Sequence, residues 1–438
     1  MAEIRPIQPW RYNSALSKDI QKLTSPLFDV VSERQRQKLY AEPLNSIHLS
    51  VPNGDDPIQN SKATLAQWKA DGTLIKDQAP AFYCYTQAFS IPGSDKVYKR
   101  KGIIANIRIY DWDENVLLRH ENTMPHSVSD REELLSQTQL NVSPTHGLYS
   151  DPTHEIESYI DESMLNPIYE VEDYQGVTDS LSVIHDRKII ERIIEIIRDK
   201  QVILADGHHR YEGSLAHMKK QRDQNPHHSG YEGYNYHLMY LTNTESEDLR
   251  ILPTHRVVSS SYNISEAHLL QKLEDDFIIK TVENPQDIHE IILGKKWAFG
   301  LLVGENAYKI RLKPEKIDTI PWNFPDAIKE LDLTVMHYFV FEKILGIPGK
   351  DQRASRIISF QRNFTECVKQ VLKEEARFAI ITKDIPIETV KEVCYSGYTM
   401  PQKSTYFYPK VICGFLFNSI KEDEFNTGLS TSFQFPSA

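Results

Sequence analysis

The chain has 438 residues, of which 40% are hydrophobic and 25% are charged, and its formal net charge is −11 at pH 7. This composition is that of a globular protein, which excludes disorder along most of the sequence, and the length predicts two or three domains. The Lys and Arg residues are spread along the sequence and form no basic cluster, so nucleic acid is disfavoured as a partner.

The four cysteines lie far apart and form no C-x-x-C pair, which disfavours both a disulfide framework and a cysteine zinc site. No apolar segment follows the charged N-terminus, and no apolar run approaches the roughly 18 residues that a membrane helix needs. We therefore predict a cytoplasmic protein without a secretory signal or a membrane span. The sequence leaves the oligomeric state open.

The N-terminal region, residues 1–118, is predicted to mix helices and strands around a β-hairpin. Residues 81–90 and 97–110 are rich in aromatic and β-branched side chains, and residues 92–95 between them read Pro-Gly-Ser-Asp. Two strand-like runs joined by such residues are typical of a hairpin.

The central region, residues 119–260, shows the clearest pattern. The elements expected here are a helix at 187–199, a strand at 201–205, a helix at 208–223 and strands at 236–241 and 249–258. The order is therefore helix, strand, tight turn and helix, with Asp206-Gly207 at the turn.

In the C-terminal region, residues 261–420, predicted helices and strands alternate, which favours an α/β layer. The elements expected here are a hairpin of strands 297–303 and 308–312, a long amphipathic helix at 326–345, strands at 356–360 and 377–382, and helices at 365–376 and 387–395. The remaining residues, 421–438, are polar and are expected to form a flexible tail. The predicted fold class is thus α/β with mixed α+β character.

Six functional side chains are concentrated in the seven residues Asp206-Gly207-His208-His209-Arg210-Tyr211-Glu212. A glycine permits a positive φ and a close approach of a ligand, and the first N–H groups of a helix attract anions together with the helix dipole. Arg210 can bind a phosphate or carboxylate through two hydrogen bonds, and the histidines can donate hydrogen bonds or move a proton. Asp206 and Glu212 can hold a magnesium ion or act as acid and base. The segment therefore predicts a phosphate site.

Two other interpretations of this segment are open. In one, Asp206 caps the helix while the histidines and Arg210 form a structural network. The other is a zinc site, which is disfavoured because adjacent histidines point to different faces of a helix and the i, i+4 spacing is absent. The P-loop, G-x-G-x-x-G, H-E-x-x-H and G-x-S-x-G signatures are also absent, which disfavours P-loop and kinase-fold phosphoryl transfer.

Further candidate site residues lie in three other polar segments. Residues 120–131 combine acids, bases and a cation, and residues 400–410 combine Lys, Ser and Thr with aromatic side chains. A lysine in such a segment can meet a phosphate as a point charge. The candidates are Glu121, His126, Arg131, His255 after Pro253, Lys403 and Ser404. An ordinary charged loop and a turn entering a strand are the alternatives.

The motifs ADGHHRYEGSLAHM, RHENTMPH, SDREELL, NVSPTHGLYSD, ILPTHR and TMPQKSTYFYPK resemble the bacterial and archaeal family known as domain of unknown function 1015, and the resemblance runs from about Ile4 to Phe417. Within it, the D-G-H-H-R turn resembles the phosphate-binding turn of the ParB/sulfiredoxin-like superfamily, which includes chromosome-partition nucleotide-binding proteins, sulfiredoxin and free-serine kinases. The resemblance implies a ParB/sulfiredoxin-like core and phosphate binding by Gly207, His208, His209 and Arg210. It also implies a glutamate base, for which Glu121 is the candidate. The catalytic cysteine of sulfiredoxin has no counterpart, because this turn carries His208.

The leading hypothesis is phosphoryl transfer on a small hydroxylated metabolite, with serine and phosphoserine as the favoured pair, in the kinase or the phosphatase direction. The catalytic candidates are Glu121, Asp206, His208 and His209. Asp206 or Glu212 would hold Mg²⁺, ATP or ADP would be the nucleotide, and Lys403 would assist at the phosphate. The alternatives are a ParB-like nucleotide-binding regulatory module without metabolic turnover, and an inert scaffold whose polar motifs are structural.

Overall fold

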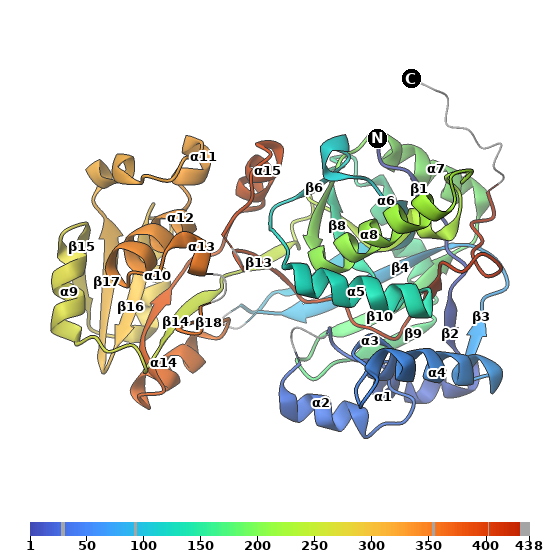
Figure 1. Ribbon diagram of the computed structural model, residues 1–438, viewed down its shortest axis with the longest axis horizontal. Helices are drawn as coiled ribbons and strands as arrows, with labels where there is room; N and C mark the ends of the chain where they lie inside the picture. Colours follow the sequence, from blue (N-terminus) through green and yellow to red (C-terminus); the bar gives the residue numbers. More distant parts are fainter. Residues whose placement is uncertain (28–30, 92–93, 353–354, 402, 430–438) are drawn as a thin grey trace. The chain divides into compact units, whose positions relative to one another are not determined.

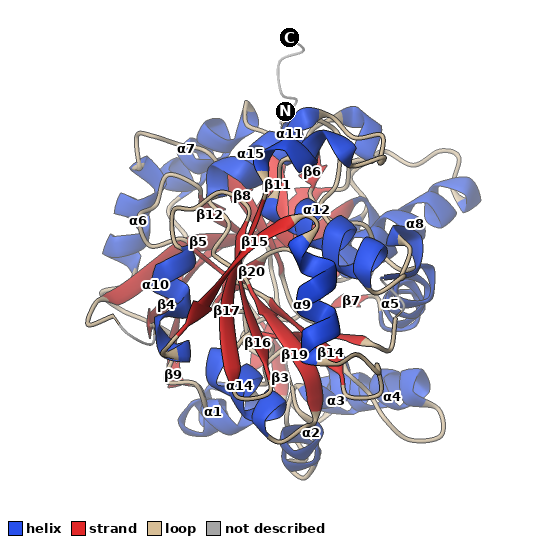
Figure 2. Ribbon diagram, turned by 90° about the vertical axis from the view of Figure 1, so that its left-hand side faces the viewer, coloured by secondary structure: helices blue, strands red, loops and turns tan. Residues whose placement is uncertain are grey.

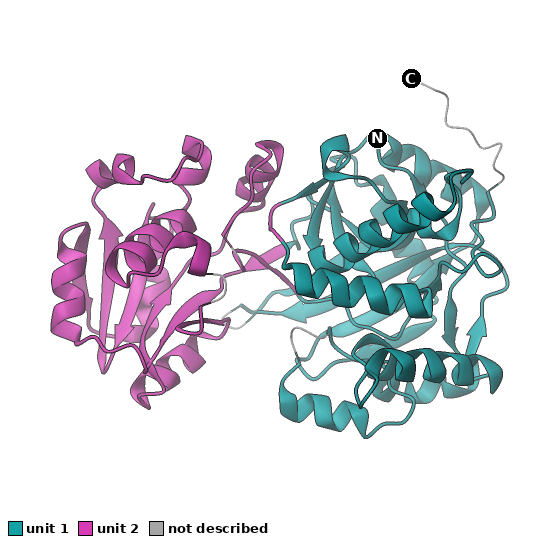
Figure 3. Ribbon diagram, in the orientation of Figure 1, with its two compact units in different colours: residues 1–119, 123–249, 409–438 teal, residues 120–122, 250–408 magenta. Residues whose placement is uncertain are grey.

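The computed structural model describes residues 1–27, 31–91, 94–352, 355–401 and 403–429. The chain divides into two units, which we call unit 1 and unit 2 (Figure 3). Unit 1 contains Met1–Arg119, Thr123–Leu249 and the segment from Pro409 onward, and unit 2 contains His120–Asn122 and Arg250–Tyr408.

This division differs from the four predicted segments. The N-terminal and central regions share one unit because their strands pair in one sheet, and the segment after Tyr408 returns to that unit. Local patterns identify strands, but they do not reveal which distant strands pair. Of the predicted tail, residues 430–438 lie outside the described residues, whereas Glu424 accepts hydrogen bonds from Trp10 Nε1 at 2.9 Å and Lys69 Nζ at 2.6 Å.

Unit 1 is built on a mixed sheet, in which the described residues form nine strands. Its strands lie in the order β6 (Leu117–Arg119), β11 (Val202–Asp206), β8 (Thr145–Tyr149), β12 (Tyr236–Asn243), β5 (Val97–Arg108), β4 (Phe82–Ser90), β10 (Thr178–Ile184) and β9 (Tyr169–Glu172), with β1 (Ile4–Arg5) beside β5. The pairs β6–β11 and β8–β12 are parallel, and the others are antiparallel. The predicted hairpin is confirmed, because β4 and β5 pair from Tyr83↔Ile104 to Ser90↔Val97. Residues 92–93 of its turn lie outside the described residues.

Helices cover both faces of this sheet (Figure 1). One core contains α6 (Glu155–Ser163), α7 (Arg187–Arg198) and α8 (His208–Gln224), and the other contains α1 (Ile20–Leu23), α3 (Ile47–Ser50) and α4 (Pro57–Ala70). Helix α5 (Pro125–Thr138) packs beside α8. The remaining short elements are α2 (Glu33–Tyr40) and the pairs β2 (Trp10–Tyr12) with β3 (Leu74–Lys76) and β7 (Leu140–Asn141) with β21 (Asn418–Ser419).

The predicted order of helix, strand, turn and helix is confirmed as α7, β11 and α8. Four isoleucines of α7 (Ile190, Ile193, Ile194 and Ile197) are buried in the core, and Ile189 and Ile196 are partly buried against it, as their spacing indicates. Strand β11 ends at Asp206, and Gly207 follows with φ 91° before α8 begins at His208. In the register of the sheet Asp206 pairs with His146, so the turn lies beside the beginning of β8.

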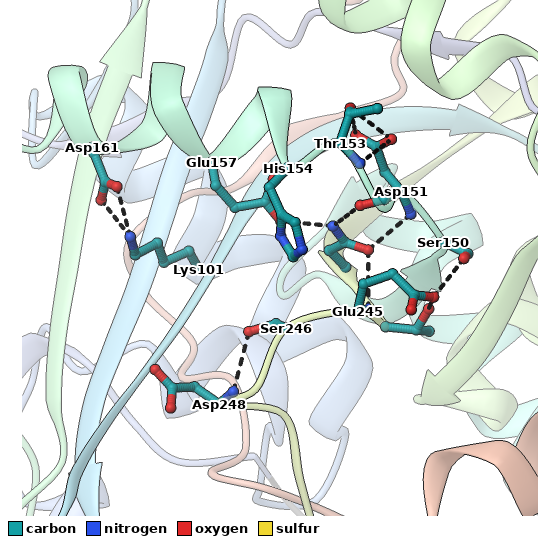
Figure 4. Close-up of polar contacts among 12 residues, drawn as sticks. Lys101, Ser150, Asp151, Thr153, His154, Glu157, Asp161, Glu245, Ser246 and Asp248 are labelled. Atoms are coloured by element: carbon teal, nitrogen blue, oxygen red, sulfur yellow. Dashed lines mark hydrogen bonds and ion pairs between the residues drawn. The ribbon is translucent and has the colours of Figure 1, made fainter.

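A different polar cluster, which includes Ser150, Asp151, Glu157 and Glu245, is shown in Figure 4. It lies at the C-terminal ends of β8 and β12, away from the α8 turn, where Tyr149 pairs with Asn243. Asn243 is 1% exposed. Its Oδ1 accepts from the backbone N–H of Asp151 at 2.9 Å and of Glu245 at 3.2 Å. Its Nδ2 donates to the carbonyl of Asp151 at 2.7 Å and to Glu157 Oε1 at 2.9 Å. The amide thus joins the two strand ends, which indicates a structural role.

We expect Asn243→Ala to lower the free energy of unfolding by about 2 kcal/mol, because the N–H and carbonyl of buried Asp151 lose their partner, as do the N–H of Glu245 and the partly buried carboxylate of Glu157. Urea denaturation measures this difference. The control is Ser150→Ala, whose exposed hydroxyl bonds only Glu245, and which should change stability by less than about 0.5 kcal/mol. Equal stability of the two variants would contradict the structural role of Asn243.

Unit 2 is built on an antiparallel sheet of six strands within the described residues (Figure 2). Its strands lie in the order β15 (Phe277–Val282), β17 (Asn306–Leu312), β16 (Ala298–Val303), β19 (Ala376–Ile381), β14 (His255–Ser259) and β18 (Ile358–Gln361). One core contains residues of α9 (Glu266–Glu274), and the other contains residues of α10 (Ile288–Ile292) and α14 (Phe364–Leu372). Helices α13 (Gly349–Gln352) and α15 (Ile387–Tyr395) complete the unit. The predicted hairpin at 297–312 and the predicted alternation are confirmed, as is the mixed α/β fold class.

Two sequence predictions in unit 2 are corrected. The strand predicted at 249–258 is split at Pro253, which has no N–H to donate, into β13 (Arg250–Leu252) and β14. Strand β13 pairs with β20 (Tyr406–Tyr408) and β14 with β18 and β19, so the two halves belong to different sheets.

The single helix predicted at 326–345 is also divided. It forms α11 (Asp326–Lys329), α12 (Asp332–Met336) and the π-helical segment His337–Ile344. Leu331 between the first two is extended, and Trp297 provides competing hydrogen bonds there, from Nε1 to Glu330 O at 2.8 Å and from its N–H to Asp332 Oδ1 at 2.7 Å. These tertiary contacts override the helical pattern.

Among the helices of the described residues, none combines the length and apolar character that crossing a bilayer requires.

Candidate anion site at the start of helix α8

The turn before α8 requires glycine. Gly207 has φ 91°, and a Cβ at this position would lie 2.6 Å from Thr145 Cγ2. Gly207 is the N-cap residue of the 17-residue helix α8, and it has no side chain that could accept a hydrogen bond from the helix start. The first N–H groups of α8 are therefore not occupied by a capping side chain, which is the arrangement that favours an anion at a helix start.

Two cations contact the carboxylate that precedes this turn. Asp206 Oδ2 accepts from Arg210 Nη2 at 3.1 Å, and Oδ1 is in close contact with Lys410 Nζ. Burial opposes ionisation of this carboxyl, but Lys410 and Arg210 outweigh it and hold the pKa of Asp206 well below its ordinary value. Their side chains are only 11% to 15% exposed. The three side chains thus carry one net positive charge in a largely buried place.

The other donors of Arg210 are directed at the loop before β8. Nη1 donates to Ser143 Oγ at 2.9 Å and to Pro144 O at 2.8 Å. The guanidinium is therefore held by a carboxylate and two neutral groups rather than by a second acid. This arrangement fixes Arg210 against β8 and leaves its charge only partly compensated.

Two buried histidines beside these cations remain neutral. His237 Nε2 pairs with Thr145 Oγ1 at 3.0 Å, and burial, with Arg210 second, lowers the pKa of His237 to about 3. His146 Nε2 pairs with Thr242 Oγ1 at 2.7 Å, and burial lowers its pKa well below the ordinary value. These rings add neither positive nor negative charge to the site at neutral pH.

His209 lies at the second residue of α8. Its Nε2 accepts the backbone N–H of Met124 at 3.0 Å, so Nδ1 is the ring nitrogen that carries the proton. His208, at the first residue, is buried. Of the two more distant candidates in unit 1, His126 is exposed, while Arg131 donates from Nη1 to Ser50 O at 3.0 Å.

The predicted metal ligands do not fit a magnesium site as they are placed. Asp206 is neutralised by two cations, and Glu212 accepts from Arg119 Nη1 at 2.7 Å, from Trp112 Nε1 at 3.1 Å and from Thr123 Oγ1. In the parts of the chain that the structure describes, no group of three His, Cys, Asp or Glu side chains is arranged to hold a metal ion. We therefore derive no chemistry through a metal at these residues.

The remaining candidates belong to unit 2. Glu121 Oε1 accepts the backbone N–H of Lys403 at 3.4 Å, and Lys403 Nζ lies 5.5 Å from the ring centroid of Phe360. Ser404 is buried and donates to Pro401 O. His255 Nδ1 accepts the N–H of Thr382 at 3.2 Å, which gives it a structural contact inside the sheet.

Sequence reasoning missed several residues at the turn. These are Lys410, Ser143, Thr145, His146 and His237. The signal was present, because four of them lie in motifs that carry the family resemblance, NVSPTHGLYSD and TMPQKSTYFYPK. The choice of Lys403 over Lys410 within the second motif had no local basis.

Comparison with known proteins identifies the family. A family described as protein of unknown function (DUF1015) matches residues 4–334. No curated protein matches the chain. Among solved structures, it is similar to a conserved hypothetical protein from Pyrococcus furiosus (TM-score 0.34, 13% identity, covering 70% of this chain and 93% of that one). It is also similar to a free serine kinase mutant in complex with AMP (TM-score 0.35, 14% identity, 74% and 97% covered) and to C-terminally truncated SbnI from Staphylococcus aureus (TM-score 0.36, 11% identity, 73% and 90% covered). Because the family match spans most of the sequence, the chain belongs to the DUF1015 family of proteins of unknown function.

Proposed function

We propose that this protein transfers a phosphoryl group to or from a small hydroxylated metabolite, with serine and phosphoserine as the favoured pair. The observation that carries the proposal is the start of α8, where amides without a capping side chain adjoin Asp206, Lys410 and Arg210, whose summed charge is positive. A phosphate at this place would meet the helix amides and compensate the excess charge. Phosphoryl transfer depends mainly on such positioning and charge neutralisation.

The reaction can run in either of two directions. In the kinase direction the serine Oγ forms a bond to the terminal phosphorus of ATP or ADP, the bridging P–O bond breaks, and the hydroxyl proton passes to a base. In the phosphatase direction a water oxygen forms the bond to phosphorus, the Oγ–P bond of phosphoserine breaks, and serine Oγ gains a proton. The proposed proton carrier is His209, which belongs to the same unit as the α8 turn.

The test is to incubate purified protein with phosphoserine, and separately with serine plus ATP or ADP, with and without Mg²⁺, while following phosphate and nucleotide. We expect turnover of one substrate set and a loss of about 100-fold in kcat for His209→Ala, which removes a general acid–base group. The matched control is His227→Ala, because His227 is exposed in the loop after α8 and should leave kcat unchanged.

Two outcomes would contradict enzymatic transfer. Binding of phosphoserine or nucleotide without turnover under any of these conditions would favour a regulatory binding module. Equal activity of the His209→Ala and His227→Ala variants would remove His209 from the chemistry.

A further inference from the structure

Unit 2 contains a cavity of about 700 Å³ that the phosphate site does not use. Its described lining includes the aromatic side chains of Trp322, Phe324, Phe360 and Tyr398. The rings of Trp322 and Phe324 meet edge to face with centroids 5.9 Å apart, and Phe324 meets Tyr398 in the same way at 6.3 Å. A cavity of this size that combines aromatic walls with polar side chains is typical of small-molecule sites.

One residue of the cavity lining is also the first residue of the π-helical segment. His337 lines the cavity and is the first residue of that segment, in which the N–H of Leu345 donates to Val340 O at 3.0 Å, five residues back. Such wide turns are rare and occur mostly at functional sites. The backbone therefore changes from α-helical to π-helical geometry at a residue that lines the cavity.

The protonation of His337 follows from its neighbour Gln352. The amide Nε2 of Gln352 donates to His337 O and to Ile347 O, both at 2.9 Å, which leaves Oε1 as the acceptor. Oε1 lies 2.6 Å from His337 Nδ1, so Nδ1 carries the proton and Nε2 presents a lone pair. Burial, with Arg256 second, lowers the pKa of His337 to about 3, so the ring is neutral at physiological pH.

This lone pair has no hydrogen-bond donor among the described residues. Nε2 of His337 is buried without a partner there, and the residue is 6% exposed. A buried acceptor without a donor costs about 1–3 kcal/mol, so a ligand that donates a hydrogen bond would be stabilised here.

The charges around the cavity lack the positive excess of the site proposed at α8. Among the described residues, Glu121 and Glu342 of the lining contribute two carboxylates. Against them stand the ammonium of Lys350 in the lining and the guanidinium of Arg256, which lies 5.3 Å from the ring centroid of Phe360. Glu342 is held in place by the N–H of Gly349, at 2.6 Å from Oε2. Because these charges balance and His337 presents an acceptor, the cavity favours an uncharged ligand that donates a hydrogen bond.

We propose that this cavity binds an uncharged heteroaromatic ring that bears an amino group. The ring packs against the aromatic wall of Trp322 and Phe324, and the amino N–H donates to Nε2 of His337. This second ligand site is independent of the phosphate site, and it gives unit 2 a recognition function of its own.

The experiment compares two uncharged probes by calorimetry, adenosine and purine riboside, which lacks only the exocyclic amino group. We expect the protein to bind adenosine at least tenfold more tightly than purine riboside. His337→Leu should weaken adenosine binding at least tenfold and change purine riboside binding less than twofold. The matched control is His289→Leu, since His289 is a partly buried histidine of unit 2 that is not among the residues lining the cavity.

A second variant keeps the test decisive should His337→Leu fail to fold. Phe324→Ala removes a half-buried ring of the wall and should weaken both probes by a similar factor. ¹⁵N-histidine spectra give an independent readout, because adenosine should shift the Nε2 resonance of His337 and purine riboside should not. Absence of adenosine binding, or equal binding of the two probes with no effect of His337→Leu, would overturn the proposal. Since neither probe carries a phosphate, such a failure would leave the function proposed for α8 standing.

Discussion

The variant Lys410→Met is expected to lose about 3 kcal/mol of unfolding free energy and at least tenfold in affinity for phosphoserine. The stability loss arises because Asp206 keeps only Arg210 as a counterion in a largely buried site, and breaking a buried ion pair is strongly destabilising. The affinity loss arises because the three charged side chains would then sum to zero, which removes the field that favours an anion. Urea denaturation and titration calorimetry measure the two effects.

Two further variants separate these effects from a general change in charge. Lys188→Met removes an exposed lysine of α7 and should alter neither quantity appreciably. Asp206→Asn combined with Lys410→Met should recover part of the lost stability, because no buried carboxylate is left short of a counterion. If Lys410→Met bound phosphoserine with unchanged affinity, the proposed anion site would be wrong. If its free energy of unfolding were unchanged, the ion pair between Asp206 and Lys410 would not stabilise the fold.

The second large expected effect is a pH dependence of the free energy of unfolding that arises from the carboxyl group of Asp179. This carboxyl on β10 is fully buried, and burial raises its pKa to about 7 despite hydrogen bonds from Tyr85 and from Gln87 Nε2 at 2.8 Å. Asp173 raises the pKa further and Arg100 lowers it.

The sign follows from proton binding. Between about pH 4 and pH 7 the folded protein holds one proton more at Asp179 than the unfolded chain does, so the free energy of unfolding falls as pH rises through this range. The fall amounts to roughly 4 kcal/mol at most. Asp179→Asn removes it, so the variant should gain stability relative to wild type as pH increases from 4 to 8.

Urea denaturation of wild type and variant at a series of pH values measures this difference directly. Asp161→Asn serves as the control, because Asp161 is an exposed carboxyl paired with Lys101 and its variant should differ from wild type by a small, nearly constant amount. A stability difference between Asp179→Asn and wild type that does not vary with pH would show that Asp179 is already ionised in the folded protein.

Elements with a strong local pattern were predictable. The isoleucines of α7, the apolar run of β11 and the helical residues after Gly207 each determine their own conformation, since periodicity and turn chemistry act over a few residues. The prediction of a single helix at 326–345 was wrong, because the contacts that divide this helix come from a residue that is distant in the sequence. Trp297, which lies 33 and 35 residues before them in the chain, forms hydrogen bonds with Glu330 and Asp332 and divides the helix.

The candidate site was predictable in the same way only in part. The residues of the α8 turn are contiguous, so their concentration is visible in the sequence. Lys410 lies 204 positions from Asp206, and only the return of the last segment to unit 1 brings the two together. The sequence likewise contains His337 and Gln352 without any signal that they pair, because the π-helical segment and helix α13 must both form before their side chains meet.

By itself, the sequence determined the strand–glycine–helix turn, the mixed fold class and the family, because each rests on residues that are close neighbours or on motifs that can be matched directly. The tertiary structure alone decided which charges surround Asp206, which lysine contacts it, and that unit 2 encloses a cavity with a buried imidazole. Those features depend on contacts between distant segments, and a hydrogen bond or ion pair forms only after the chain has paid the entropy of bringing such segments together.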